Sequence, residues 1–440
     1  MDLIIKNGHI VDPSQGIDFI GCVHIKNGLI IRIEKAVSAV MPEITPPEIT
    51  KVIDASGLYI FPGLFDMHTH LREPGFEYKE TIKSGTRAAV RGGFTSVCCM
   101  PNTKPVNDNE TVTEFIVKKS LSEGFCNVFP IGAITKRQEG SELAEMGMMK
   151  DAGCVAFSDD GRPVGDSLLM RRALEYSKVF SSPIISHAED LSLSNDGVMN
   201  EGYLSTTLGL RGIPAASEVI AIKRDIELAA LTGGRLHIAH VSTAGGVRAI
   251  REAKRDGIAV TAETCPHYFH LTEAEAVGYN TAAKVNPPLR TIKDVEAVRQ
   301  GLIDGTIDVI ATDHAPHHRD DKICEFDGAA FGISGLETAF SLSFALVKEG
   351  VLPLNELIEK MTIRPSQILK LNKGTLKDGA DADIVIVDLN KDFIIDPEQF
   401  VSKGKNTPFG GRRLSGLPVM TLCKGMVKYH FNNSIIMDGI

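Results

Sequence analysis

The sequence predicts an α/β protein: a (β/α)8 TIM-like barrel with a small β-sandwich domain built from both chain termini. Three observations predict this fold. Short β-branched runs with glycine turns lie near each end of the 440-residue chain, eight apolar runs occupy its middle, and most of those eight precede a stretch with helical periodicity. The repeated strand–helix order implies parallel strands with crossover helices, and eight such units favour a closed barrel over an open sheet.

Residues 1–60 are predicted to form the N-terminal part of the β-sandwich domain. The segments LIIKNGHIVDP, DFIGCVHIKNGLIIRIEK and KVIDASGLYI join short strand-like runs through Asn-Gly and Gly turns, which is typical of antiparallel hairpins. The Pro-rich segment MPEITPPEIT is expected to be a connector. Residues 372–440 repeat the short-strand pattern in GADADIVIVDLN and VMTLCKGMVKYHF, so the two ends are expected to share one sheet.

Residues 61–371 are predicted to form the barrel domain. Two of its clearest helical segments are DSLLMRRALEYSKVF and ASEVIAIKRDIELAALTG. Its eight strand-like runs are, in order, FPGLFDMH, FTSVCCMP, NVFPIGAI, CVAFSD, PIISHAE, RLHIAHV, IAVTAETC and DVIATDH.

Composition argues against several classes of protein. With 43% hydrophobic and 23% charged residues the chain has the usage of a globular protein, and a net charge of −9 without blocks of like charge argues against nucleic acid or an anionic membrane as partner. No apolar run reaches the roughly 18 to 20 residues of a membrane span, and Asp2 leaves no basic start for a signal peptide. We therefore expect a cytoplasmic protein. Its eight irregularly spaced cysteines, without a C-x-x-C pair, are expected to be reduced, buried thiols.

Metal-competent side chains stand where several of the strand-like runs end. Alternation along a strand aims the two histidines of the H-x-H pair to the same side, and barrel enzymes carry their catalytic groups at the carboxyl ends of the strands. One such histidine alone is more often a surface or core residue, but four at strand ends predict a metal site. Imidazole and carboxylate suit zinc, although manganese or cobalt could also be held. The residues are His68, His70, Asp159, Asp160, His187, His240 and Asp313.

Eight short motifs follow one another along the chain. They are DMHTHLREPG at 66–75, MPNTKP at 100–105, FSDDG at 157–161, HAED at 187–190, HVST at 240–243, ETCPHY at 263–268, KVNPPLR at 284–290 and ATDHAPH at 311–317. Together they resemble the amidohydrolases, and within them the type I dihydroorotases, over nearly the whole chain.

The resemblance implies a site for two zinc ions, with a single zinc left open. The H-x-H pair and Asp313 match the ligands of the more buried metal, and His187 and His240 match those of the second. Many amidohydrolases bridge the metals with a carbamylated lysine, where this sequence has FSDDG. Type I dihydroorotases use an aspartate, which we assign to Asp160. Asp159 is the alternative, because one step along the strand decides which carboxylate faces inward.

The implied activity is the reversible cyclisation of N-carbamoyl-L-aspartate to L-dihydroorotate plus water, in de novo pyrimidine (UMP) biosynthesis. Zinc lowers the pKa of bound water to near 7 and so provides a hydroxide for attack on the ring amide. Asp313, bound to metal beside that water, is expected to act as general base and then as general acid.

The substrate also carries a carboxylate, which requires a fixed cation. Arg72, immediately beyond the H-x-H pair, can bind it in a two-pronged manner, although a surface ion pair is the alternative. Two adjacent histidines, His317 and His318, end and follow the motif DHAPH, and only the match to this motif selects His317. His267 and His270 are expected to be structural. His314 is expected to point away from the site. The resemblance adds these contacts to the carboxylate or the ring: Asn102, Asn286, His317, Phe331 and Gly332.

Two other functions stay open. A hydantoinase or allantoinase would share the fold, but the absent lysine and the presence of Arg72 argue against it. A non-catalytic subunit supporting aspartate transcarbamoylase would be expected to lack metal ligands, and none is missing here. A homodimer is expected, association with aspartate transcarbamoylase is left open, and the segment HHRDDKICEFDGAAFGISG is expected to cover the mouth of the barrel.

Overall fold

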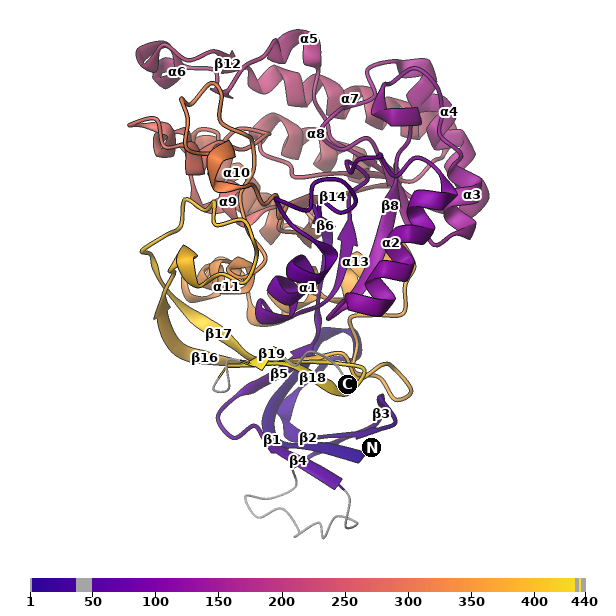
Figure 1. The fold of residues 1–440 in the computed structure, drawn as a ribbon, viewed down its shortest axis with the longest axis vertical. Coiled ribbons are helices and arrows are strands. Elements are labelled where there is room, and N and C mark those ends of the chain that lie inside the picture. Colours follow the sequence, from indigo (N-terminus) through magenta and orange to yellow (C-terminus); the bar gives the residue numbers. More distant parts are fainter. Residues whose placement is uncertain (1, 37–49, 432–434, 437–440) are drawn as a thin grey trace.

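The computed structural model describes residues 2–36, 50–431 and 435–436. Two large sheets organise this part of the chain: an eight-stranded sheet that forms the barrel and a nine-stranded sheet that contains strands from both ends of the chain (Figure 1). The fold class predicted from the sequence is confirmed. The predicted connector MPEITPPEIT lies outside the described residues except for Thr50. No helix in the described ranges combines the length and the apolar character that a membrane span requires.

The barrel strands follow one another in sequence order, and each pairs in parallel with the next. A parallel bridge between Thr69 and His314 and a 2.9 Å hydrogen bond from the His70 amide to the His314 carbonyl join the last strand region to the first. Each predicted run contains one barrel strand, except that β6 continues one residue beyond the first run, to Thr69. The strands are β6 (Leu64–Thr69), β7 (Phe94–Cys99), β8 (Asn127–Gly132), β9 (Ala156–Ser158), β10 (Ile184–Ser186), β13 (Leu236–Ile238), β14 (Val260–Thr264) and β15 (Val309–Ile310).

Helices cover the outside of the barrel (Figure 1). Local signals set their ends: the side chains of Thr81 and Ser84 form a capping box at the first barrel helix, and Gly233, in the left-handed region, ends the longest helix. The two helical segments singled out from the sequence contain α4 and most of α7. The helices are α1 (Ile82–Arg91), α2 (Glu110–Glu123), α3 (Met146–Asp151), α4 (Ser167–Ser177), α5 (Leu191–Ser194), α6 (Tyr203–Leu208), α7 (Ala215–Thr232), α8 (Ala244–Arg255), α9 (Pro266–His270), α10 (Ile292–Ile303), α11 (Ala339–Lys348), α12 (Leu354–Met361) and α13 (Ile363–Leu369).

The barrel strands are buried on both faces, which explains why their sequences are continuous apolar runs. Along β6, Leu64 belongs to the cluster that includes the covering helices, whereas its neighbour Phe65 belongs to a second cluster with Ile131 and Val309. Both faces of the sheet therefore contribute to the core, and only the strand ends are left for polar chemistry.

The second sheet joins the two ends of the chain, because β5 pairs antiparallel with β16. This confirms that the terminal segments share one sheet. A separate two-stranded sheet of β11 (Met199–Asn200) and β12 (Gly212–Ile213) is inserted in the chain between the barrel strands β10 and β13. The strands of the nine-stranded sheet are β1 (Asp2–Asp12), β2 (Ile17–Lys26), β3 (Leu29–Lys35), β4 (Thr50–Asp54), β5 (Tyr59–Pro62), β16 (Ile384–Ile394), β17 (Arg413–Cys423), β18 (Met426–His430) and β19 (Ile435–Ile436).

The predicted hairpins are only partly right. Asn27 and Gly28 form the expected turn, with φ of 52° and 81°, between antiparallel β2 and β3. Asn7 and Gly8 do not form a turn: they lie inside β1, where the register against β2 shifts as in a β-bulge. The third segment gives β4 and β5, which pair with β1 in parallel and not antiparallel. A β-bulge and a turn use the same residue types, so the pattern does not distinguish them.

Candidate metal centre and active site

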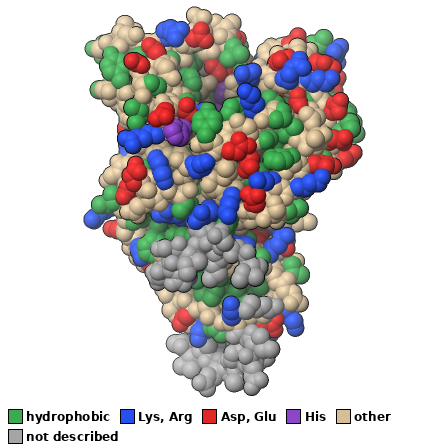
Figure 2. Space-filling view, in the orientation of Figure 1, with side chains coloured by type: hydrophobic (Ala, Val, Ile, Leu, Met, Phe, Trp, Pro, Cys, Tyr) green, Lys and Arg blue, Asp and Glu red, His purple; other side chains and the backbone are tan. Residues whose placement is uncertain are grey.

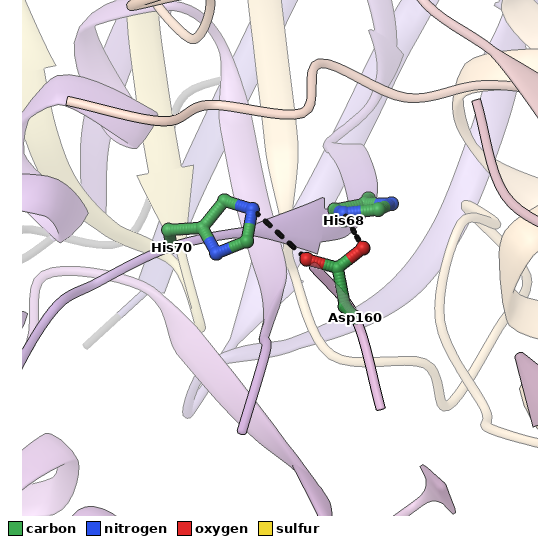
Figure 3. Close-up of side chains that lie close together, drawn as sticks. All are labelled: His68, His70 and Asp160. Atoms are coloured by element: carbon green, nitrogen blue, oxygen red, sulfur yellow. Dashed lines mark ion pairs between the residues drawn. The ribbon is translucent and has the colours of Figure 1, made fainter. Parts of the chain in front are cut away.

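The carboxyl ends of the barrel strands bring the predicted metal ligands to one place. His68 and His70 lie at the end of β6, and Asp160 lies two residues after β9. Asp160 Oδ1 is 3.4 Å from His68 Nε2, and its Oδ2 is 3.5 Å from His70 Nε2 (Figure 3). Asp313, three residues after β15, places Oδ1 3.0 Å from His70 Nε2 and 3.6 Å from His68 Nε2. Two imidazoles and two carboxylates thus meet around one point.

The other side of Asp160 faces a second pair of imidazoles. Its Oδ1 is 3.4 Å from His187 Nδ1 and 3.4 Å from His240 Nε2, and these two nitrogens are 2.9 Å apart. Both histidines follow strands of the barrel, β10 and β13. Asp160 therefore stands between two groups, each able to hold a metal ion.

The neighbouring carboxylate, Asp159, points elsewhere. Its Oδ1 accepts hydrogen bonds from the backbone amides of Ile134 and Thr135 at 2.7 and 3.0 Å, and its Oδ2 accepts one from the Thr135 hydroxyl. Adjacent residues at a strand end face opposite sides, so only one of the two carboxylates can reach the imidazoles. In this structure that residue is Asp160.

The backbone is strained where the strands end. His240 and Asp313 have φ of 36° and 45°, in the left-handed region that residues with a Cβ rarely adopt. Arg72, just past β6, has φ of 63°. Such conformations cost of order 1–3 kcal/mol each and persist where surrounding contacts over-determine them. The backbone conformations that orient these three side chains therefore lower the stability of the fold.

The electrostatics of the site favour positive charge. Burial by itself lowers the pKa of His68, but Asp160 and Glu263 together raise it well above its usual value. Burial also opposes ionisation of His187, yet Asp160 and Glu189 raise its pKa to about 10. The carboxylates thus hold protons on buried imidazoles, and a bound cation would replace those protons.

A metal ion fits the donor atoms. His68 is fully buried, and its Nε2 makes no hydrogen bond among the described residues although two carboxylates face it. A ligand bond to a cation would satisfy this atom, whereas leaving it unpaired costs free energy. A donor set of imidazole nitrogen and carboxylate oxygen is one that zinc prefers.

Carboxylate and amide oxygens orient three of the imidazoles from behind. Glu263 Oε1 lies 2.5 Å from His68 Nδ1, and Glu189 Oε2 lies 3.0 Å from His187 Nε2. Asn102 Oδ1 lies 2.8 Å from His70 Nδ1. Such contacts fix the tautomer of a metal-binding histidine. Neither glutamate was predicted to have a role, although Glu263 lies in the motif ETCPHY and Glu189 in HAED.

A cavity of about 180 Å³ adjoins the metal-binding groups. The residues expected to bind substrate line it together with all the predicted metal ligands except His68, and histidine side chains are visible in and beside a hollow in the upper part of the face shown in Figure 2. A larger groove of about 800 Å³ lies nearby, but its lining includes none of the predicted ligands. The predicted substrate-binding residues that line the smaller cavity are Arg72, Asn102, Asn286, His317, Phe331 and Gly332.

Arg72 is the cation of this cavity. Burial lowers its pKa to about 10, while Asp313 and Asp160 oppose that change, so the guanidinium stays charged at neutral pH. Its Nε donates to the Pro316 carbonyl at 3.2 Å, which leaves its terminal nitrogens near the cavity. Asn102 lines the cavity too, but its carbonyl oxygen is already bonded to His70.

The remaining histidines of the motifs lie outside the cavity lining. His270 Nε2 is 2.7 Å from the Leu342 carbonyl, and burial lowers the pKa of His267 to about 4. His314 turns from Asp313 toward Glu80, with Nε2 3.5 Å from Oε2, and its Nδ1 accepts from the Gly335 amide. The side chain of His318 is 49% exposed, which leaves His317 as the inward one of that pair.

Comparison with known proteins assigns the family. A sequence model described as "Dihydro-orotase-like" matches residues 57–245. The chain is 54% identical to the dihydroorotase of Pelobacter propionicus over 98% of its own length and 100% of that protein, and 55% identical to the dihydroorotase of Geobacter metallireducens over the same shares. Its structure resembles L-hydantoinase from Arthrobacter aurescens, with a TM-score of 0.87, 27% identity and coverage of 99% of this chain and 97% of that one. The chain therefore belongs to the dihydroorotase family of amidohydrolases.

Proposed function

We propose that this protein is a dihydroorotase, which interconverts N-carbamoyl-L-aspartate and L-dihydroorotate with release of water in pyrimidine biosynthesis. The observation that carries the proposal is the pairing of a two-part metal-binding cluster with a buried arginine in one cavity. A cyclic amide that also carries a carboxylate needs both. The identity to curated dihydroorotases supports the same substrate.

The proposed cofactor is zinc, two ions per chain. His68, His70 and Asp313 would hold one ion, His187 and His240 the other, and Asp160 would bridge them. The position of Asp160, about 3.4–3.5 Å from all four imidazoles, supports the bridging role. When bound, zinc supplies a water nucleophile at neutral pH and polarises the amide carbonyl.

Asp313 is the proposed general base and acid. Burial opposes its ionisation, but the hydrogen bond from His70 and the charge on His68 hold its pKa below the usual range, so it is a carboxylate before reaction. Its oxygens border the cavity, where it can take a proton from the attacking water and deliver it to the leaving ring nitrogen. In ring closure the two transfers run in reverse: the carboxylate takes a proton from the attacking nitrogen and gives it to the departing water.

The other cavity residues would bind and orient the substrate. Arg72 would bind its carboxylate, with Asn102 and His317 beside it, and Asn286 would contact the ring. Gly332 has φ of 145°, and an added Cβ would lie 2.6 Å from the Ala315 carbonyl oxygen. A glycine is therefore needed where the backbone of Phe331 and Gly332 approaches the ring.

The proposed function also includes an oligomeric state, a cellular location and a possible partner enzyme. We propose a homodimer in the cytoplasm, open to association with aspartate transcarbamoylase. Light scattering of the purified chain, alone and mixed with the transcarbamoylase of the same organism, tests the assembly. A monomer that shows no change on mixing would contradict both parts.

A direct assay separates this function from that of the structural neighbours. L-dihydroorotate, hydantoin and allantoin are offered in parallel to the zinc-loaded protein, and turnover of dihydroorotate alone is expected, since only its ring bears the carboxylate that Arg72 needs. The likeness to L-hydantoinase makes hydantoin the second candidate. Preferential turnover of hydantoin would overturn the proposal.

A further inference from the structure

Lys79 lies beside the proposed carboxylate pocket without a role in the reaction described above. Its Nζ is 3.2 Å from His317 Nδ1 and 3.2 Å from Asp321 Oδ2. The Lys79 and His317 side chains are only 16% and 8% exposed, so water screens their contact poorly. The ammonium of Lys79 also lies over the rings of Phe76 and Tyr78.

The contacts of His317 select one tautomer. Its Nε2 is 2.7 Å from the Phe331 carbonyl oxygen, which can only accept, so Nε2 must carry the proton. A neutral imidazole then has a bare Nδ1, which accepts from Lys79. Burial, followed by the charges of Arg72 and Lys79, lowers the pKa of His317 to about 2 and so keeps the ring neutral.

This tautomer leaves Arg72 free for substrate. Arg72 Nη2 is 3.3 Å from His317 Nε2, a distance at which the nitrogen could accept a hydrogen bond. Since Nε2 already donates to the closer Phe331 carbonyl, it has no lone pair to offer, and the Nη2 hydrogens of Arg72 remain available.

The alternative tautomer would damage the pocket in two ways. Asp321 Oδ2 is 3.6 Å from His317 Nδ1 and would draw a proton to that nitrogen once Lys79 is gone. Nε2 would then accept from Arg72 and would face the Phe331 carbonyl oxygen as a second acceptor. One donor for the carboxylate would be lost, and the backbone that lines the ring site would be repelled.

We propose that Lys79 is a positioning residue for substrate binding, which fixes His317 in its Nε2-protonated tautomer and thereby keeps Arg72 and the Phe331 backbone in their binding geometry. This inference rests on the proposed function for the identity of the substrate. The tautomer itself is a property of the protein without substrate.

Steady-state kinetics test the binding role. Lys79→Met is expected to raise KM for dihydroorotate about tenfold, the loss of roughly one charge-assisted hydrogen bond, with kcat and zinc content nearly unchanged. Lys79→Arg keeps a cationic donor and should restore most of the affinity. Lys118→Met, which removes a 73% exposed lysine on α2, is the matched control and should match the parent. An unchanged KM in Lys79→Met, or an equal loss of kcat in Lys79→Met and Lys79→Arg, would overturn the role.

Nitrogen-15 NMR of histidine-labelled protein tests the tautomer without any turnover. The His317 signals are assigned by their absence in His317→Gln. The parent and Lys79→Arg are expected to show a protonated Nε2, and Lys79→Met a shift of the proton toward Nδ1. A protonated Nδ1 in the parent would overturn the inference even if Lys79→Met failed to fold. Because this measurement needs no substrate, it stands apart from a failure of the proposed function.

Discussion

The proposed metal centre and the proposed carboxylate pocket border one cavity but are built differently. The metal-binding side chains stand within three residues of barrel strand ends and pair imidazole with carboxylate. The pocket around Arg72 is made by segments beyond the strands, and Lys79, Lys284 and Lys322 gather there, with Asp321 beside Lys79. In the proposed function the barrel would fix the chemistry and the loops the choice of substrate, so the two should respond separately to mutation.

The strongest test of this separation is Asp313→Asn. The amide cannot accept and return the proton, so kcat should fall by several orders of magnitude in both directions while the fold is kept. Turnover of each direction, with circular dichroism of the variant, measures this. Asp320→Asn, at an 88% exposed position, is the control. Near-normal turnover in Asp313→Asn would refute the assignment of proton transfer.

Replacing the cation of the pocket should act on binding. Arg72→Met is expected to weaken binding of carboxylate-bearing substrates by about 2–4 kcal/mol, which appears as a higher KM with metal content unchanged. Arg255→Met, at a 75% exposed side chain, should have no effect. If KM stayed at the parent value, or if zinc were lost together with affinity for substrate, the two regions would not be separable as described.

A substitution behind the metal ligands should instead change zinc affinity and leave substrate binding nearly unchanged. Glu263→Gln replaces the carboxylate that orients His68 and should lower zinc affinity roughly 10- to 100-fold, while KM of the zinc-saturated enzyme changes little. Competition with a chelator measures the affinity, with Glu142→Gln, a 67% exposed residue, as control. Parent-like zinc affinity in Glu263→Gln would show that Glu263 does not support the metal.

Lys322, in the segment after β15, is expected to make the stability of the protein depend on pH. Burial, followed by repulsion from Lys284, lowers the pKa of Lys322 to about 7, whereas an unfolded lysine titrates near about 10.4. Between these values the unfolded chain binds a proton that the folded chain does not, so this lysine makes the free energy of unfolding rise with pH, by up to about 1.4 kcal/mol per unit.

Lys322→Met should remove that slope. Its Nζ lies 2.7–3.1 Å from the carbonyl oxygens of Thr281, Lys284 and Ala330, and the neutral amine can donate to two of them, so the variant should be less stable overall, by a margin that widens from pH 7 to pH 9.5. Urea unfolding of both proteins across this range provides the measurement. Curves for the parent and the variant that run parallel would contradict the lowered pKa.

Much of the fold and of the metal cluster could be predicted from the sequence, because both rest on local patterns. Buried parallel strands are continuous apolar runs, and the H-x-H pair ends one of them. The choice between Asp159 and Asp160 was predictable only by resemblance, since it depends on which side of a strand end faces inward. In the structure, Asp160 lies among the imidazoles.

The rest depends on contacts between distant segments. Glu263 reaches His68 across 195 residues and Lys79 reaches His317 across 238, and neither pair leaves a periodic signal. The parallel pairing of β1 with β5 could not be predicted either, because the residues of a strand do not determine whether its partner runs parallel or antiparallel to it. The left-handed backbone at His240 and Asp313 also leaves no signal in the sequence, because only a small fraction of histidines and aspartates adopt it.

A crystal structure of the zinc-loaded protein with dihydroorotate, with anomalous scattering measured at the zinc edge, would locate both the metal ions and the substrate carboxylate. We expect two anomalous peaks on either side of Asp160, one beside His68 and His70 and one beside His187 and His240, with the substrate carboxylate against Arg72. Absence of any peak among these imidazoles, or a substrate carboxylate bound away from Arg72, would contradict it.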